Sequence, residues 1–296
     1  MIKNGKSITT TRYLLRIIHR VLNDAVRKGK LARNVADLAD PPPARKAENS
    51  VWNEQQLDVF LTAAAQWGRL YELFATLALT GLRVSEGLGL QWRDVDLNTD
   101  QPACFVRRAV YKVAGKWRCE EPKTPRSRRK VELTQALSLL LRRWLERQEA
   151  VTDWSGRKLL DNDFVFARED GTLPDRHYVS KIFQHIIGQA RLPRIRLHDL
   201  RHTVATLLRK NGRSIEEISK MLGHANEAIT VTIYSHWKGE SRAAADTMDS
   251  ILESAEKKRN AGALVRNSLE EGRGIESRPY RSRTCDTLIK SQGVLV

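Results

Sequence analysis

Two segments of the chain place arginine and histidine where they could hold a phosphate group. Arg83 follows Gly81 at the expected start of a helix, where main-chain amides and the helix dipole also attract an anion. His198 and Arg201 are three residues apart, so they project from one face of an expected helix. Reaction at a phosphodiester spreads negative charge over its oxygens, and a planar guanidinium can hold two of them at once. These residues are therefore candidates to bind and activate a phosphate.

A tyrosine and a second histidine stand later in the chain. His224 ends an expected helix, and Tyr234 follows it by ten residues. A phenol with a pKa of about 10 is a poor nucleophile unless nearby cations stabilise its anion. Arg83 and Arg201 would supply that charge if the fold brings them together.

The spacing of His198 and His202 is also that of a helical zinc pair. However, Asp199 stands where the H-E-x-x-H motif has glutamate, and no third ligand follows. We therefore expect no metal and no other cofactor. His202 is expected to be a packed, hydrogen-bonded histidine beneath the site.

The composition indicates a partner that is a polyanion. Lys and Arg total 51 against 35 Asp and Glu, which gives a formal charge of +16. Between Arg107 and Lys130 there are ten basic residues and only two acidic ones. Neutralising phosphates with such residues releases counterions and favours binding. A secreted protein is not expected, because the three cysteines are widely spaced and the chain has no apolar leader. A membrane protein is not expected either, because no apolar run reaches about 20 residues.

The pattern of apolar residues predicts a mainly α fold with a small antiparallel β-sheet (α+β). Capping boxes at Asn53 and Ser214 each mark the start of a helix. The proline run at 41–43 separates residues 1–43 from a catalytic domain at 44–258, and residues 259–296 form a basic tail with no sustained period. Helices are expected at about 11–28, 53–67, 71–80, 134–148, 175–191, 198–210, 214–222, 227–235 and 240–257, with strands between 103 and 133 around a turn at Gly115.

Four segments in this order resemble the tyrosine recombinase (phage integrase) family. They are TGLRVSEGLGLQWRDVDL at 80–97, EPKTPRSRRKVEL at 121–133, LHDLRHTVATLLRKNG at 197–212 and MLGHANEAITVTIYSHW at 221–237. The resemblance covers about residues 50–240 and is specific because several motifs agree in sequence order. It implies a tyrosine-recombinase-like catalytic domain, preceded here by a partial helical core-binding (SAM-like) domain.

The resemblance also implies a role for each candidate residue. Tyr234 would attack a DNA phosphate and form a 3′-phosphotyrosyl bond, without metal or ATP. Lys123 would protonate the leaving 5′ oxygen, with Lys112 and Lys116 as alternative donors. The other implied catalytic residues are Arg83 and Arg201 as phosphate clamps, His198 as an acid/base group, and His224 as a hydrogen-bond donor to the phosphate, with Glu86 orienting an arginine or histidine. The expected DNA-binding residues are Arg107, Arg108, Lys112, Lys116, Arg126, Arg128, Arg129 and Lys130.

We therefore expect a site-specific recombinase that integrates or excises a mobile element. Its partners would be duplex attachment sites, three further copies of the chain in a homotetramer, and accessory DNA-bending or excision factors. It would act in the cytoplasm, associated with the nucleoid of a bacterium or with a phage.

Two alternatives remain open. About 40 residues precede the proline run, where integrases usually have about a hundred in the core-binding domain. A chain shortened in this way could be a non-catalytic DNA-binding remnant. A type IB topoisomerase uses the same residue types, although the LGH and T-x-x-Y-x-H segments favour a recombinase. The residues at 277–292 also resemble translated non-coding sequence.

Overall fold

The computed structural model describes most of the chain, in two compact units of residues 1–49 and 50–296. The division lies close to the predicted boundary after Pro43. The described residues are 7–43, 50–121, 128–154, 156–223, 252–254 and 256–257.

The first unit is a helix followed by a single helical turn. Helix α1 (Ile8–Arg27) begins with Ser7 accepting a hydrogen bond from the Thr10 amide, and η2 (Val35–Leu38) packs against it. Asn34 joins the two elements through its side-chain amide, which donates to the His19 carbonyl at 3.1 Å. None of the α1 residues is buried. Of the predicted apolar face, Ile18 and Val21 are exposed, and Leu14, Leu22, Ala25 and Val26 are only half-buried.

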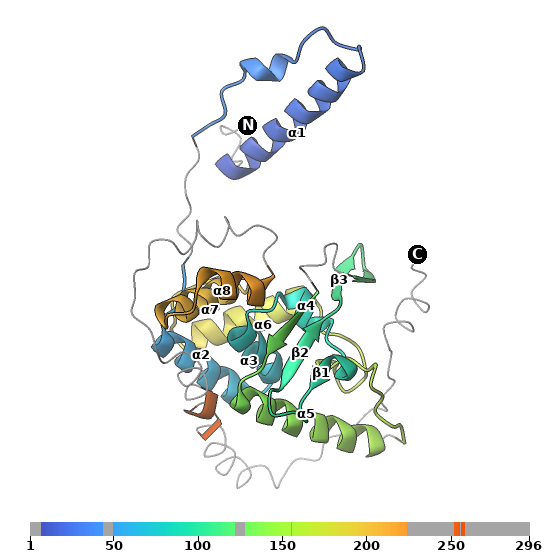
Figure 1. The fold of residues 1–296 in the computed structure, drawn as a ribbon, viewed down its shortest axis with the longest axis vertical. Helices are drawn as coiled ribbons and strands as arrows, with labels where there is room; N and C mark the ends of the chain where they lie inside the picture. Colours follow the sequence, from blue (N-terminus) through green and yellow to red (C-terminus); the bar gives the residue numbers. More distant parts are fainter. Residues whose placement is uncertain are drawn as a thin grey trace. The chain divides into compact units, whose positions relative to one another are not determined.

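The second unit is mainly helical, which confirms the predicted fold class. Its long helices pack around α3, which contacts α2, α4, α5 and α7 (Figure 1). All ten α3 residues are buried. The helices are α2 (Glu54–Trp67), α3 (Tyr71–Thr80), α4 (Val84–Leu88), α5 (Gln135–Trp154), α6 (Arg176–Gln189), α7 (Asp199–Lys210) and α8 (Ile215–Leu222), with a 3-10 turn η3 (Trp92–Asp94).

An aromatic cluster fixes α2, α3 and α6 against one another. Phe60 lies 5.1 Å from both Trp52 and Phe183, measured between ring centroids, and packs edge-on against Phe74. The Trp52 amide also donates to the Thr203 hydroxyl on α7 at 3.2 Å. Helix α7 thereby packs beside α3. This packing brings Arg201 of α7 close to Arg83, which follows α3.

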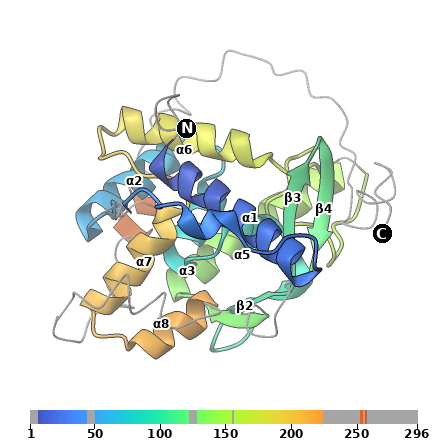
Figure 2. The same cartoon turned by 90° about the horizontal axis from the view of Figure 1, so that it is seen from above.

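The strands form two antiparallel sheets where the sequence predicted one. The first has the order β1 (Val95–Asp96), β2 (Ala103–Val106), β5 (Arg129–Glu132), and the second is the hairpin of β3 (Ala109–Val113) and β4 (Lys116–Glu120). Between β2 and β3, Arg107 and Arg108 interrupt the strand-like run, and the Arg108 guanidinium turns back to the Asp94 carboxylate. Figures 1 and 2 show the hairpin on the side of this unit away from α2.

Several other elements match or extend the prediction. Both expected capping boxes are formed, at Asn53 and Ser214. Helix α5 runs six residues beyond its predicted end, to Trp154, and the sequence did not indicate η2, η3 or the two-residue β1 as separate elements. The predicted helix at 227–235 lies outside the described residues, and of the one at 240–257 only 252–254 and 256–257 are described, as helix. Within the described part of the chain, no helix is both long and apolar enough to cross a membrane.

Candidate active site

Gly81 makes the turn that presents Arg83. Helix α3 ends at Thr80, and Gly81 follows in the left-handed conformation with φ of +65°. A Cβ at this position would lie 2.5 Å from the Leu222 Cδ2, so α8 packs directly on the turn. Arg83 then becomes the N-cap of α4, as its place after Gly81 predicted. Its side chain is 38% exposed.

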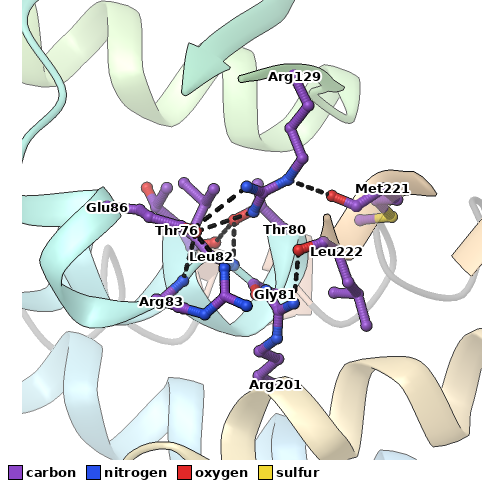
Figure 3. Close-up of polar contacts among 10 residues, drawn as sticks. All are labelled: Thr76, Thr80, Gly81, Leu82, Arg83, Glu86, Arg129, Arg201, Met221 and Leu222. Carbon is purple, nitrogen blue, oxygen red and sulfur yellow. Dashed lines mark hydrogen bonds and ion pairs between the residues drawn. The ribbon is translucent and has the colours of Figure 1, made fainter. Parts of the chain in front are cut away.

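Arg201 lies beneath this turn, on the first turn of α7. The residue is 2% exposed. Its Nη1 donates to the Gly81 carbonyl at 2.8 Å, and its Nη2 donates to the Leu222 carbonyl at the end of α8 (Figure 3). One guanidinium thus joins segments that are 120 and 21 residues from it in the chain. A carbonyl near a helix end lacks an intrahelical partner, so these bonds also satisfy carbonyls at the ends of α3 and α8.

Glu86 lies between two arginines. Its Oε1 accepts from the Arg83 Nη1 at 2.7 Å, and its Oε2 accepts from the Arg129 Nη2 at 2.8 Å (Figure 3). Burial raises the pKa of this carboxyl, but the hydrogen bond and charge of Arg129 and the charge of Arg83 outweigh it and lower the pKa to about 2. Glu86 is therefore a stable anion that holds Arg83 in place.

His198 stands at the N-cap of α7, on the exposed surface beside these cations. Its pKa is lowered to about 4, because the protein shields part of the ring from water and because His202, Arg201 and Arg83 oppose a further positive charge. The rings of His198 and His202 meet edge to face at 5.4 Å. At neutral pH the His198 ring is thus an uncharged base.

The carboxylate of Asp199, the residue after His198, is already bound by Arg196. Its Oδ2 accepts from the Arg196 amide at 2.8 Å, and its Oδ1 accepts from the Arg196 Nη2 at 2.9 Å. Burial raises the pKa of Asp199, and these hydrogen bonds lower it by more. Across the described ranges, no group of three or more His, Cys, Asp and Glu side chains could hold a metal ion.

The basic surface expected to meet a polyanion is only partly exposed. Lys112 and Lys116 lie at the open tip of the β3–β4 hairpin, where Ala114 and Gly115 both have positive φ. Arg107, Arg128 and Lys130 are also exposed. Arg108 and Arg129 differ from that expectation. The Arg108 side chain is 11% exposed and pairs with Asp94, and the Arg129 side chain is 5% exposed and pairs with Glu86.

Strand alternation explains why Arg129 points inward. Along β5, Arg129 and Val131 face the protein, while Lys130 and Glu132 face solvent. The side chains of a strand point to opposite faces in turn, so a run of basic residues cannot all be exposed on one side. The alternation of apolar Val131 and Leu133 with polar residues could have predicted from the sequence that Arg129 points inward. No sequence pattern could have predicted that the main-chain carbonyls of Met221 and Leu222 bind arginines.

Four predicted site residues lie outside the described residues. They are Lys123, Arg126, His224 and Tyr234. Helix α8 is capped by Gly223, with φ of +66°, which is the last described residue before 252. The described part of the site is therefore Arg83, Glu86, His198 and Arg201, drawn together from α4 and α7.

Comparison with known proteins identifies the family. Residues 51–240 match the model of the phage integrase family. The ICEBs1 integrase of Bacillus subtilis (strain 168) is 28% identical over 257 residues, which cover 85% of this chain and 68% of that protein. A tyrosine recombinase XerC-like protein of Caldanaerobacter subterraneus subsp. tengcongensis is 30% identical over 252 residues, with coverages of 79% and 64%. The chain spans about two thirds of the length of these relatives.

Solved structures share the fold. The integrase of the Tn1549 transposon, in complex with transposon right end DNA, superposes with a TM-score of 0.70 at 21% identity, covering 89% of this chain and 82% of that one. A lambda integrase dimer bound to a COC′ core site has a TM-score of 0.53 at 15% identity, with coverages of 81% and 63%. The match over residues 51–240 places the chain in the phage integrase family of tyrosine recombinases.

Proposed function

We propose that this protein is a site-specific DNA recombinase that cuts and rejoins duplex DNA through a covalent bond to Tyr234. The observation that carries the proposal is the convergence of Arg83, Arg201 and His198 around Gly81. Shielding from water lowers the pKa of His198 most, and the charges of both arginines lower it further. A phosphate is the group that such a surplus of positive charge would stabilise.

The proposed cleavage step is a transesterification. The uncharged His198 accepts the phenol proton of Tyr234, and the phenolate oxygen attacks the phosphorus. The bond from phosphorus to the 5′ oxygen breaks, and that oxygen takes a proton from Lys123. The product is a 3′-phosphotyrosyl ester and a free 5′ hydroxyl. One ester replaces another, so the energy of the broken bond is retained.

Rejoining reverses these proton transfers. A 5′ hydroxyl from a partner duplex gives its proton to Lys123 and attacks the phosphotyrosyl phosphorus. Tyr234 leaves and recovers its proton from His198. Arg83 faces the phosphate, Arg201 adds charge from beneath, and His224 donates a hydrogen bond to a phosphate oxygen.

The proposed partners follow from this chemistry. Exchange between two duplexes requires four strand cleavages, which four copies of the chain on two attachment sites would provide. Accessory DNA-bending or excision factors would set the direction. Relatives named as integrases and a neighbour bound to transposon right end DNA support a mobile element as the substrate. The proposed place of action is the cytoplasm, on nucleoid DNA.

The test is a search for a covalent protein to DNA adduct. Duplexes tiled across the DNA that flanks the gene, and nicked to trap cleavage, are incubated with the wild type and with Tyr234→Phe. Tyr178→Phe is the matched control, because Tyr178 lies on α6, outside the predicted catalytic and DNA-binding residues. We expect an adduct with the wild type and Tyr178→Phe and none with Tyr234→Phe.

Other outcomes identify the alternatives. DNA binding without an adduct on any duplex would support the non-catalytic remnant. An adduct together with relaxation of a supercoiled plasmid that lacks the flanking sequences would support the topoisomerase.

A further inference from the structure

We infer that Arg129 is a positioning residue of the active site, which holds Arg83 and the end of α8 together, and not a DNA contact. The inference deepens the proposed function and rests on it. The Arg129 side chain is 5% exposed and is therefore closed to a phosphate in solution. Its neighbour Arg128 is 58% exposed and pairs with the exposed Glu121.

The Arg129 guanidinium contacts two separate segments of the protein. Its Nη2 and Nη1 face the two oxygens of Glu86, at 2.8 and 3.3 Å. Its Nε donates to the Met221 carbonyl in the last turn of α8 at 2.6 Å. The planar fork of arginine can satisfy a carboxylate and a carbonyl at the same time, which the single ammonium of lysine cannot do with this geometry.

Each of these contacts leads to the site. Through Glu86, Arg129 fixes the carboxylate whose other oxygen holds the Arg83 Nη1. Through Met221, it fixes the carbonyl that precedes the one bound by Arg201. Two guanidinium groups therefore fasten the end of α8 to the segment from Gly81 to Glu86, one on each of two successive carbonyls (Figure 3).

The packing around Gly223 agrees with this role. A Cβ on Gly223 would lie 3.0 Å from both the Cδ and the Nη1 of Arg129. The chain therefore closes tightly over the guanidinium where α8 ends. The next residue in the sequence is His224, so Arg129 sets the position from which the chain leaves toward His224 and Tyr234.

The test compares Arg129 variants by three measurements. They are the salt dependence of DNA binding, the single-turnover rate of adduct formation at saturating DNA, and amide hydrogen exchange in residues 215–223 without DNA. For Arg129→Gln we expect an unchanged salt slope, an adduct rate lowered about 100-fold, as a misplaced catalytic group produces, and faster exchange at the end of α8. For Arg129→Lys we expect partial recovery of the rate, because the charge beside Glu86 remains.

Two controls separate this role from others. Arg128→Gln should lower the salt slope by about 0.9, the value for one lost phosphate contact. Arg157→Gln breaks another arginine–carboxylate pair, with Asp163 at 2.8 Å, away from the site. It should lower the melting temperature yet leave the adduct rate at its wild-type value.

The inference is overturned by a wild-type adduct rate in Arg129→Gln, or by a salt slope that falls as it does in Arg128→Gln. If Arg129→Gln does not fold at the assay temperature, Arg129→Lys decides. A full wild-type rate there would mean that charge alone suffices and that the Met221 bond has no role. If the wild type forms no adduct, the proposed function fails, and hydrogen exchange on the DNA-free variants still tests the contact with α8.

Discussion

At the scale of single residues, the site is an excess of positive charge around one buried anion. Glu86 is in contact with Arg83 and Arg129, and Arg201 lies on the other side of the Gly81 turn. The carboxylate compensates part of this charge and orients the arginines. Shielding from water lowers the pKa of His198 most, and the remaining charge lowers it further. The same charge leaves the partly exposed Arg83 suited to bind an anion.

The low pKa of Glu86 predicts a loss of stability in acid. Its pKa is about 2 in the folded protein and near 4.5 when unfolded. The ionised group therefore stabilises the fold above pH 4.5, and this contribution falls as the pH decreases toward 2. The shift corresponds to about 3 kcal/mol at most. We expect the free energy of unfolding to fall more steeply below pH 4.5 in the wild type than in Glu86→Gln.

Denaturant titrations of both proteins at pH 6, 5, 4 and 3.5 would measure this difference. His198 acts in the same direction but in a higher window, because its pKa falls from 6.5 to about 4 on folding. It is present in both proteins and cancels from the comparison. Parallel curves for the wild type and Glu86→Gln would contradict the buried ion pair.

At the scale of elements, two tight glycine turns allow the helices to meet. Gly81 and Gly223 both have positive φ, and each lies against a side chain from a distant segment: Leu222 for Gly81 and Arg129 for Gly223. The site thus depends on close approach between the end of α3, the end of α8 and the start of β5. Helix propensity alone would not bring these three ends together.

Replacement of Gly81 by alanine should destabilise the protein more than the same change at Gly68. Both glycines have positive φ, so both variants strain the main chain, by about 1 kcal/mol. Only Gly81→Ala adds an overlap, with Leu222 Cδ2 at 2.5 Å, whereas nothing lies within 4 Å of a Cβ at Gly68. We expect an additional loss of about 1–3 kcal/mol for Gly81→Ala, as in other overpacked sites.

Thermal and denaturant unfolding of the two variants and the wild type would measure this loss. Gly68→Ala accounts for the strain common to both positions. Equal destabilisation would show that the Leu222 side chain, or α8 as a whole, moves away from the turn without cost. In that case the close packing of α8 on Gly81 would not contribute to the site.

At the scale of the whole molecule, the charge of +16 should make DNA binding strongly dependent on salt. Lys112 and Lys116 are exposed at the tip of the β3–β4 hairpin, at the far side from α2. If both contact phosphates, Lys112→Gln with Lys116→Gln should lower the slope of log affinity against log salt by about 1.8. Fluorescence anisotropy on one duplex between 50 and 300 mM KCl would measure it.

The matched control is Lys158→Gln with Lys181→Gln, which removes the same charge from outside the predicted DNA-binding residues. It should leave the slope close to the wild-type value. An equal decrease in both double variants would assign the binding to net charge and not to the hairpin.

The sequence by itself determined the family, the mainly α fold and most of the helices. Local signals carry this information: the capping boxes at Asn53 and Ser214, the apolar spacing of α3, and the four short motifs in order. It also identified Arg83, His198 and Arg201 as candidates that could act together. Their roles, and those of Lys123, His224 and Tyr234, stay predictions.

Only the tertiary structure decided which arginines face solvent and what holds the site together. Arg128 and Arg129 are neighbours in one basic run, yet one lies on the surface and the other is buried against Glu86. The carbonyls of Gly81, Met221 and Leu222 became arginine partners through packing between segments far apart in the chain. Main-chain carbonyls are the same at every residue, so no sequence pattern marks which of them a folded protein will use.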